Sequence, residues 1–365
     1  MNCKKRVTIL CVLLLGPWAA FGAAAGQNPT EEAEIQILPV QGNVYMLVGA
    51  GANIAVSVGR DGVLVVDTGS PDMSEQLLET IQELAEAITA PTIPVTPCVG
   101  VRCAEFRSPY GLSSPRINAT ISSPAPPKPI RYIINTTIGP EHTGGNEALA
   151  LGGQTFLGGN VASNLEEVVP STILAHENVL NRMLDQTEGP DALSFDALPS
   201  ETYYLPTYKL SQFFNGEGIQ LYHQANAITD GDSVVFFRYS DVILAGDIFS
   251  TTSYPMFDLE QGGSIQGVLD GLNFILGLAF PEFRSQGGTM IIPGHGRLSD
   301  TGDVAIYRNM VTVITDRIRR MIGQGMSLDE VIAARPSLDY DPRYGSDTNQ
   351  TGAMFVEAVY RSLDQ

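Results

Sequence analysis

Between residues 35 and 300 the same order of elements occurs twice: a series of short apolar segments followed by a helical pattern. Residues 35–67 contain three apolar, β-branched runs separated by glycine-containing turns, which predicts a β-meander. Residues 70–88 follow with apolar side chains at helical spacing, and the order repeats where strand-like runs in 209–247 precede a helical pattern in 264–280. Each sheet must bury both faces. We therefore expect an α/β protein with helix, sheet, sheet and helix layers, a four-layer αββα sandwich.

The N-terminal segment, residues 1–25, has the layout of a cleavable secretory signal: basic residues, an apolar run and then small residues. A retained membrane anchor is the weaker interpretation, because glycine and proline interrupt a run that is short for a membrane span. We expect an exported protein, periplasmic or secreted. Its mature chain would form a domain over residues 26–300 with C-terminal helices in 301–365 packed on it, although the length also suits two smaller domains.

The formal net charge of the whole chain is −19, from 40 acidic and 21 basic residues. Nucleic acid and anionic membranes are disfavoured as partners, because both repel an acidic surface. We expect a small-molecule substrate and no membrane association once the signal is cleaved. The sequence does not indicate a protein partner.

Residues 89–129 lack hydrophobic periodicity and are rich in proline, serine and threonine, which predicts an irregular insert. It contains Cys98 and Cys103, the two cysteines that remain after signal removal. An oxidising compartment favours one small disulfide loop between them, and a zinc knuckle is the weaker alternative because no second cysteine pair or histidine is near. The insert could act as a lid over a neighbouring site or as an arm that docks a partner.

Loops at the predicted strand ends carry metal-ligating side chains, and in a sandwich these loops converge along one edge. The candidates are Glu141, His142, Asp247 and His295. Imidazole and carboxylate groups suit zinc, iron or manganese. His295 lies between two glycines, which let a loop approach a ligand closely. The alternative is structural, with His142 bonding loop backbone and Asp247 capping a loop. The sequence contains neither a Gly-x-Ser-x-Gly elbow nor a phosphate-binding P-loop.

The candidate residues lie in motifs that occur in the order VVDTG, NTTIGPEHTGGN, AITDGD, LAGDIF and IIPGHG. This order resembles the metallo-β-lactamase superfamily, in particular its glyoxalase-II-like and lactamase-like secreted members, over nearly all of residues 35–300. The resemblance implies the αββα sandwich. It also implies a metal-dependent hydrolase that cleaves an ester, lactone, thioester or lactam bond with water activated by the metal.

The chain departs from the superfamily's signature loop, His-x-His-x-Asp-His, at three of its four ligand positions. These positions are here Thr137, Gly139, Glu141 and His142, and the superfamily's next histidine falls on Ile228. Together, Thr137, Gly139 and Ile228 replace the three ligands of the all-histidine metal site. The resemblance therefore implies that this site is lost.

The other metal site of the superfamily keeps its ligand types in this chain. Glu141, His142 and His295 fall on its ligand positions, and Asp247 falls on the carboxylate that bridges two metals in binuclear members. The resemblance implies a single ion, zinc, with iron or manganese as alternatives. Glu141 is expected either to bind the ion or to act through a bound water as general base, which makes Glu141 and Asp247 the expected catalytic carboxylates.

Three further side chains near this site receive less direct predictions. Asp67 is expected to support the site by hydrogen bonding and not to bind metal. His223 ends a predicted strand and could replace a lost ligand, although a packed or surface position is the better prediction, and His176 is expected at a helix entry. The alternative function is a pseudoenzyme, a binding or scaffold protein that lost its chemistry together with three ligands.

Overall fold

The computed structural model describes residues 34–89, 128–155, 169–187, 192–210, 213–282, 287–345 and 351–364. The predicted signal segment, both mature cysteines and residues 90–127 of the predicted insert lie outside these ranges, so the predictions about them stay predictions.

The first sheet has seven strands, an antiparallel half followed by a parallel half. In spatial order the strands are β1 (Gln36–Gln41), β2 (Val44–Val48), β3 (Ile54–Gly59), β4 (Gly62–Val66), β5 (Ile130–Ile134), β6 (Thr172–His176) and β7 (Glu201–Tyr203). The first four form a meander, with one strand more than the three runs predicted for residues 35–67, and β4 to β7 are parallel to one another. Because parallel strands end at the same edge, the loops after β4, β5 and β6 lie side by side.

The second sheet has five strands. In spatial order they are β12 (Met290–Ile292), β11 (Val242–Leu244), β10 (Ser233–Phe237), β9 (Ile219–His223) and β8 (Thr207–Lys209). Only β11 and β12 are parallel, so the loops that follow these two strands share an edge. The strand-like runs predicted from residue 209 onward begin where β8 ends, at Lys209, and the short β7 has too few residues for a periodic signal.

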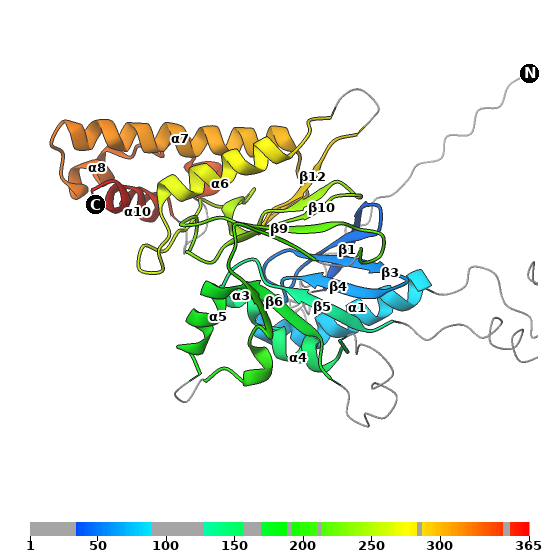
Figure 1. The fold of residues 1–365 in the computed structure, drawn as a ribbon. Coiled ribbons are helices and arrows are strands. Elements are labelled where there is room, and N and C mark those ends of the chain that lie inside the picture. Colours follow the sequence, from blue (N-terminus) through cyan, green and yellow to red (C-terminus); the bar gives the residue numbers. More distant parts are fainter. Residues whose placement is uncertain are drawn as a thin grey trace, which may run out of the picture. The chain divides into compact units, whose positions relative to one another are not determined.

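Alternation of side chains along the strands separates the three largest apolar cores of the described residues. In β4, Val65 packs under the helices of the first outer layer, whereas Leu64 joins the core between the sheets. In β10, Val235 joins the same inter-sheet core, whereas Phe236 packs under the second outer layer. The first outer layer contains α1 (Ser74–Thr89) and α4 (Asn146–Leu151), and the second contains α6 (Ile265–Leu278) and α7 (Thr301–Gly323). This is the predicted αββα sandwich, which Figure 1 shows layer by layer.

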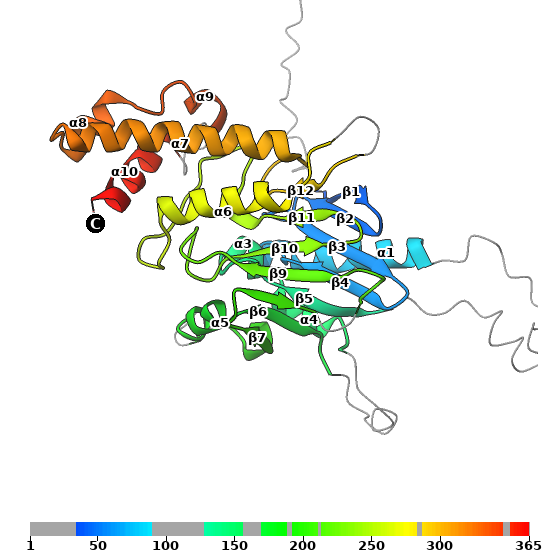
Figure 2. The ribbon, with the colours of Figure 1, turned by 45° about the horizontal axis from the view of Figure 1, so that its top comes forward.

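Shorter elements complete the fold. The remaining helices are α3 (Pro140–Thr143), α5 (Glu177–Leu184), α8 (Leu328–Ala334), α9 (Asp341–Tyr344) and α10 (Gly352–Leu363), with 3-10 turns η1 (Pro71–Met73), η4 (Phe195–Ala197) and η5 (Gly246–Ile248). The helix expected from residue 70 begins with η1, and α1 itself starts at Ser74. α7 packs along α6, and α10 contacts α7 and α8, as Figure 2 shows. None of the described helices combines the length and apolarity needed to span a membrane.

Candidate metal centre

Three of the predicted ligands meet at the edge where strands of both sheets end. His142 lies in α3 beyond β5, Asp247 lies in η5 beyond β11, and His295 lies in the loop after β12. One ligand atom from each lies within 4.8 Å of those of the other two, and the described part of the chain holds no second such group of three or more. The fold thus brings together side chains from three separate loops.

The ligand atoms face one another without satisfying one another. His142 Nε2 lies 3.0 Å from Asp247 Oδ1, and His295 Nε2 lies 3.4 Å from the same oxygen. His142 Nε2 and Asp247 Oδ1 are both buried, yet neither has a hydrogen-bond partner of acceptable geometry. Buried polar atoms are nearly always paired, so an imidazole nitrogen and a carboxylate oxygen that lie close together without a hydrogen bond suit the binding of a cation.

Asp67 fixes the orientation of His142. The Asp67 carboxylate accepts hydrogen bonds from the Thr136 backbone N–H at 2.8 Å and the Thr136 hydroxyl at 2.7 Å, and its Oδ2 lies 2.8 Å from His142 Nδ1. An ionised carboxylate only accepts, so Nδ1 carries the hydrogen and the lone pair of neutral His142 is on Nε2. This is the carboxylate–histidine arrangement that presents an imidazole to a metal.

Electrostatic coupling among these groups is strong. Burial opposes charge on His142, but Asp247 and Asp67 outweigh burial and raise the pKa of His142 well above its usual value. Burial alone would raise the pKa of Asp247, but His142 and His295 hold it well below its usual range. For His295 burial is likewise outweighed, and the adjacent Asp247 carboxylate raises its pKa. A cation that binds here therefore competes with protons for the imidazole nitrogens.

The close approach of these loops requires glycine at position 294. A Cβ on Gly294 would lie 2.4 Å from Asp247 Oδ1 and 2.8 Å from the Gly246 backbone. Only a residue without a side chain lets the His295 loop lie against η5 at this distance.

Glu141, the fourth predicted ligand, lies at the rim of the cluster. Its side chain is 53% exposed, and Oε2 lies 3.2 Å from His295 Nε2. Glu141 is not a member of the group of three. Its role as ligand or base stays a prediction.

Two positions at which the sequence resemblance implies a lost ligand carry Thr137 and Ile228. Thr137 and Ile228 are buried, at 3% and 7% exposure. The Asp232 carboxylate accepts from the Ile228 and Thr229 backbone N–H groups at 2.6 and 2.7 Å, which fixes Ile228 in its loop. Burial raises the pKa of Asp232 to about 7, although these hydrogen bonds act against it. An isoleucine side chain cannot ligate a metal at this position.

His223 lies apart from the three ligands. Its Nε2 lies 2.8 Å from the Asp230 carbonyl oxygen, and its ring stacks on His176 with centroids 3.7 Å apart and planes at 10°. His176 caps α5, with Nδ1 accepting from the Asn178 N–H, as expected for a helix entry. The described structure does not place His223 as a substitute ligand. The stacked pair was not predicted, because the register between β6 and β9, which lie in different sheets, carries no local sequence signal.

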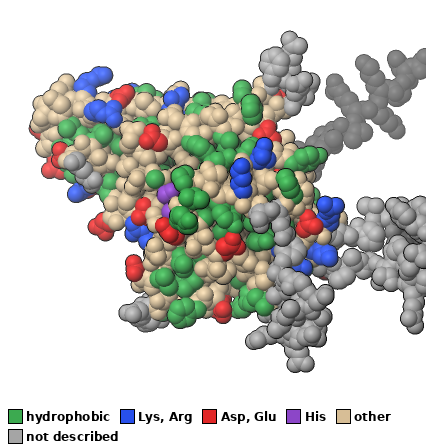
Figure 3. Space-filling view, in the orientation of Figure 1, with side chains coloured by type: hydrophobic (Ala, Val, Ile, Leu, Met, Phe, Trp, Pro, Cys, Tyr) green, Lys and Arg blue, Asp and Glu red, His purple; other side chains and the backbone are tan. Residues whose placement is uncertain are grey.

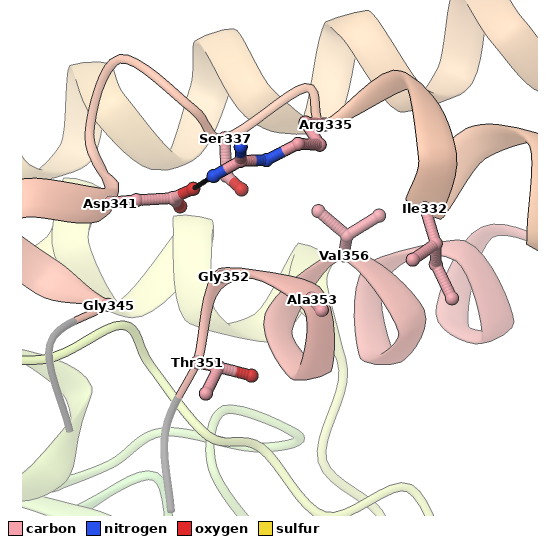
Figure 4. Close-up of a pocket in the computed structure, with 9 residues that line it drawn as sticks. All are labelled: Ile332, Arg335, Ser337, Asp341, Gly345, Thr351, Gly352, Ala353 and Val356. Atoms are coloured by element: carbon pink, nitrogen blue, oxygen red, sulfur yellow. Dashed lines mark hydrogen bonds and ion pairs between the residues drawn. The ribbon is translucent and has the colours of Figure 1, made fainter. Parts of the chain in front are cut away.

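A separate cavity of about 260 Å³ lies between α8, α9 and α10 (Figure 4). Arg335 faces it but pairs with Asp341 at 3.3 Å, and none of the lining residues belongs to the ligand cluster. Figure 3 shows acidic and basic side chains interspersed over one face of the molecule.

Comparison of the sequence with protein-family models finds no match, and comparison with curated proteins finds none either. Solved structures do resemble the chain. The inverting sec-alkylsulfatase Pisa1 from a Pseudomonas species has a TM-score of 0.52 and 12% identity, and the match covers 90% of this chain and 50% of that one. DIM-1 metallo-β-lactamase has a TM-score of 0.47 and 14% identity, covering 76% and 97%. A metallo-β-lactamase from Pontibacter korlensis has a TM-score of 0.45 and 11% identity, covering 76% and 99%.

At 12% identity the likeness to the alkylsulfatase concerns the fold and does not extend to activity. The two facing sheets, the helices on both outer faces and the ligand loops at one edge are those of the metallo-β-lactamase fold, and this chain has that fold. It spans about half the length of the alkylsulfatase.

Proposed function

We propose that the protein is a metal-dependent hydrolase with one divalent ion, zinc, held by His142, Asp247 and His295. Its substrate would be a small molecule with an ester, lactone, thioester or lactam bond. The observation that supports this most directly is the pair of buried, unpartnered atoms, His142 Nε2 and Asp247 Oδ1, beside His295 Nε2. The residue types suit zinc, and the site has the place in the fold at which loops of both sheets converge.

Within this proposal each side chain has a distinct task. Asp67 keeps the hydrogen of His142 on Nδ1, so that Nε2 stays available as a ligand. Asp247 and His295 complete the donor set from the second sheet. The proposed task of Glu141, which is half exposed beside His295, is to take a proton from water. A bound zinc ion would lower the pKa of water and polarise the scissile carbonyl.

The test is the variant His295→Ala, assayed with ester, lactone, thioester and β-lactam substrates in zinc-supplemented buffer. We expect loss of bound metal and a fall in kcat/KM of at least about 1000-fold, because the variant removes a ligand from a site with only three. His223→Ala is the matched control and should keep both metal and turnover. Hydrolysis by His295→Ala at the wild-type rate would contradict the proposal.

A second function, binding without catalysis, is favoured by one observation. Ile228 and Thr137 fill positions that would hold metal ligands in the family the sequence resembles. Wild-type protein that retains stoichiometric zinc but hydrolyses none of the four substrate classes would support this pseudoenzyme. Export through residues 1–25 and a Cys98–Cys103 disulfide remain further proposals, which the mass of the protein recovered from the periplasm or medium would test.

A further inference from the structure

One asparagine side chain from the first sheet connects to the backbone of the loop that carries His295. Asn53 lies just before β3 and is 3% exposed. Its Nδ2 donates to the Pro293 carbonyl at 2.9 Å and to the Gly296 carbonyl at 3.0 Å. Its backbone N–H donates to the Gly294 carbonyl at 2.8 Å. Three hydrogen bonds from a single residue thus bracket His295 on both sides.

The rest of the loop is held by the second sheet. The Gly294 N–H donates to the Gly246 and Phe249 carbonyls at 2.9 and 3.0 Å, and the Thr251 N–H donates to the His295 carbonyl at 3.1 Å. These bonds tie the loop to the segment around Asp247. Asn53 supplies the tie to the first sheet, which carries His142. The Asn53 side chain therefore helps to set the distance between His295 and His142.

We infer that Asn53 is a positioning residue for the metal centre, acting through the backbone on either side of His295. This inference rests on the proposed metal site. The buried Pro293 carbonyl and the partly buried Gly296 carbonyl would lose their donor in an Asn53 variant, and leaving such groups unpaired costs free energy. Shifting the loop toward other donors relieves that cost. His295 Nε2 then moves away from the ligand atoms of His142 and Asp247, and the ion loses a correctly placed ligand.

A purely structural role predicts lower stability and no specific effect at the site. The chain offers a matched control for this distinction in Asn215. Its side chain also bonds loop backbone, with Nδ2 donating to the Gly62 carbonyl at 3.0 Å and Oδ1 accepting from the Asp61 N–H at 2.9 Å. The turn it binds joins β3 to β4 and is not one of the ligand loops. Asn215→Ala should therefore lower stability and leave the metal centre unchanged.

The experiment compares Asn53→Ala and the milder Asn53→Ser with Asn215→Ala in the full chain. Zinc affinity is measured by competition with a chromophoric chelator, and the free energy of unfolding of metal-free protein is measured in urea. We expect zinc affinity to fall about 10–100-fold in Asn53→Ala, by a smaller factor in Asn53→Ser, and by less than twofold in Asn215→Ala. Unchanged zinc affinity in both Asn53 variants, or an equal loss in the Asn215 variant, would overturn the inference.

A readout without metal separates this inference from the proposed function. The chain has four histidines, so their imidazole resonances can be followed one by one in metal-free protein. We expect the His295 resonance to shift or broaden in Asn53→Ala while those of His176 and His223 stay in place, with no shift in Asn215→Ala. Wild-type protein that binds no zinc would refute the metal site, whereas an unmoved His295 resonance would refute the role of Asn53.

Discussion

At the residue scale, the candidate metal centre depends on a few side chains, and the hydrogen bonds of each determine whether it can bind a metal. His142 is a ligand candidate because Asp67 binds its Nδ1 and leaves Nε2 available. Asp247 is a candidate because its Oδ1 is buried and has no hydrogen-bond partner. Asp67 adopts a left-handed backbone conformation, with φ of 65°, directly at the end of β4. Asparagine tolerates that conformation, so the role of the Asp67 charge can be tested without backbone strain.

The variant Asp67→Asn should weaken zinc binding by about 10–100-fold, because an amide can offer its N–H₂ to His142 Nδ1 and so favour the wrong tautomer. Competition with a chelator measures the change. Asp61→Asn is the control, since Asp61 accepts from a backbone N–H at 2.8 Å outside the ligand loops. An Asp67→Asn protein with wild-type affinity would show that the carboxylate does not orient His142.

His176 should make the protein sensitive to acid. Burial, and then the adjacent His223, lower the pKa of His176 from 6.5 to about 4, although Asp230 acts in the opposite direction. The unfolded chain therefore binds more protons than the folded one between these pH values, and stability falls as pH decreases from 6.5 towards 4. We expect a loss of about 1–2 kcal/mol, less than the full shift implies because solvent screens the neighbouring His223.

Urea unfolding at pH 7 and pH 5, with a chelator present, checks the effect of His176. The variant His176→Asn keeps an acceptor for the Asn178 N–H but does not titrate, so its stability should depend less on pH than that of wild type. The metal ligands titrate in both proteins and cancel in the comparison. Equal pH dependence in the two proteins would contradict the assignment to His176.

At the element scale, α6 packs against the loop that carries Ile228. Ser264 caps α6 and its hydroxyl donates to the Asn226 carbonyl at 3.0 Å. Gly267 in the first turn lies so close to this loop that an added Cβ would be 1.7 Å from the Asn226 carbonyl oxygen. Sequence periodicity predicts α6, but it gives no reason for a glycine within it, because that reason is a contact with a distant loop.

Gly267→Ala should therefore lower the free energy of unfolding by about 3 kcal/mol or more, since backbone must move to admit the methyl group. Gly277→Ala in the same helix is the control. An added Cβ there meets nothing within 4 Å, and the variant should be neutral or more stable by up to about 1 kcal/mol. Chemical denaturation measures both variants. Equal stabilities would show that α6 does not pack on this loop as described.

At the scale of the whole molecule, the sequence predicts the layers of the fold but not the hydrogen bonds between residues that are distant in the chain. Strand alternation and helical periodicity predict the αββα sandwich, because both arise from neighbouring residues that share one core. His142, Asp247 and His295 could be named in advance because each follows an apolar strand. Asn53 could not, since its partners Pro293 and Gly296 are far along the chain in the other half of the sandwich.

The central claim is that ligands from both sheets hold one metal ion, and metal stoichiometry tests it most directly. Purified wild-type protein and the Asp247→Ala variant should be loaded with zinc and dialysed. The zinc bound per chain is then measured by elemental mass spectrometry. The account predicts one zinc ion per chain in the wild type and none in the variant. A wild-type chain with no zinc, or with two ions, would contradict a single centre formed by His142, Asp247 and His295.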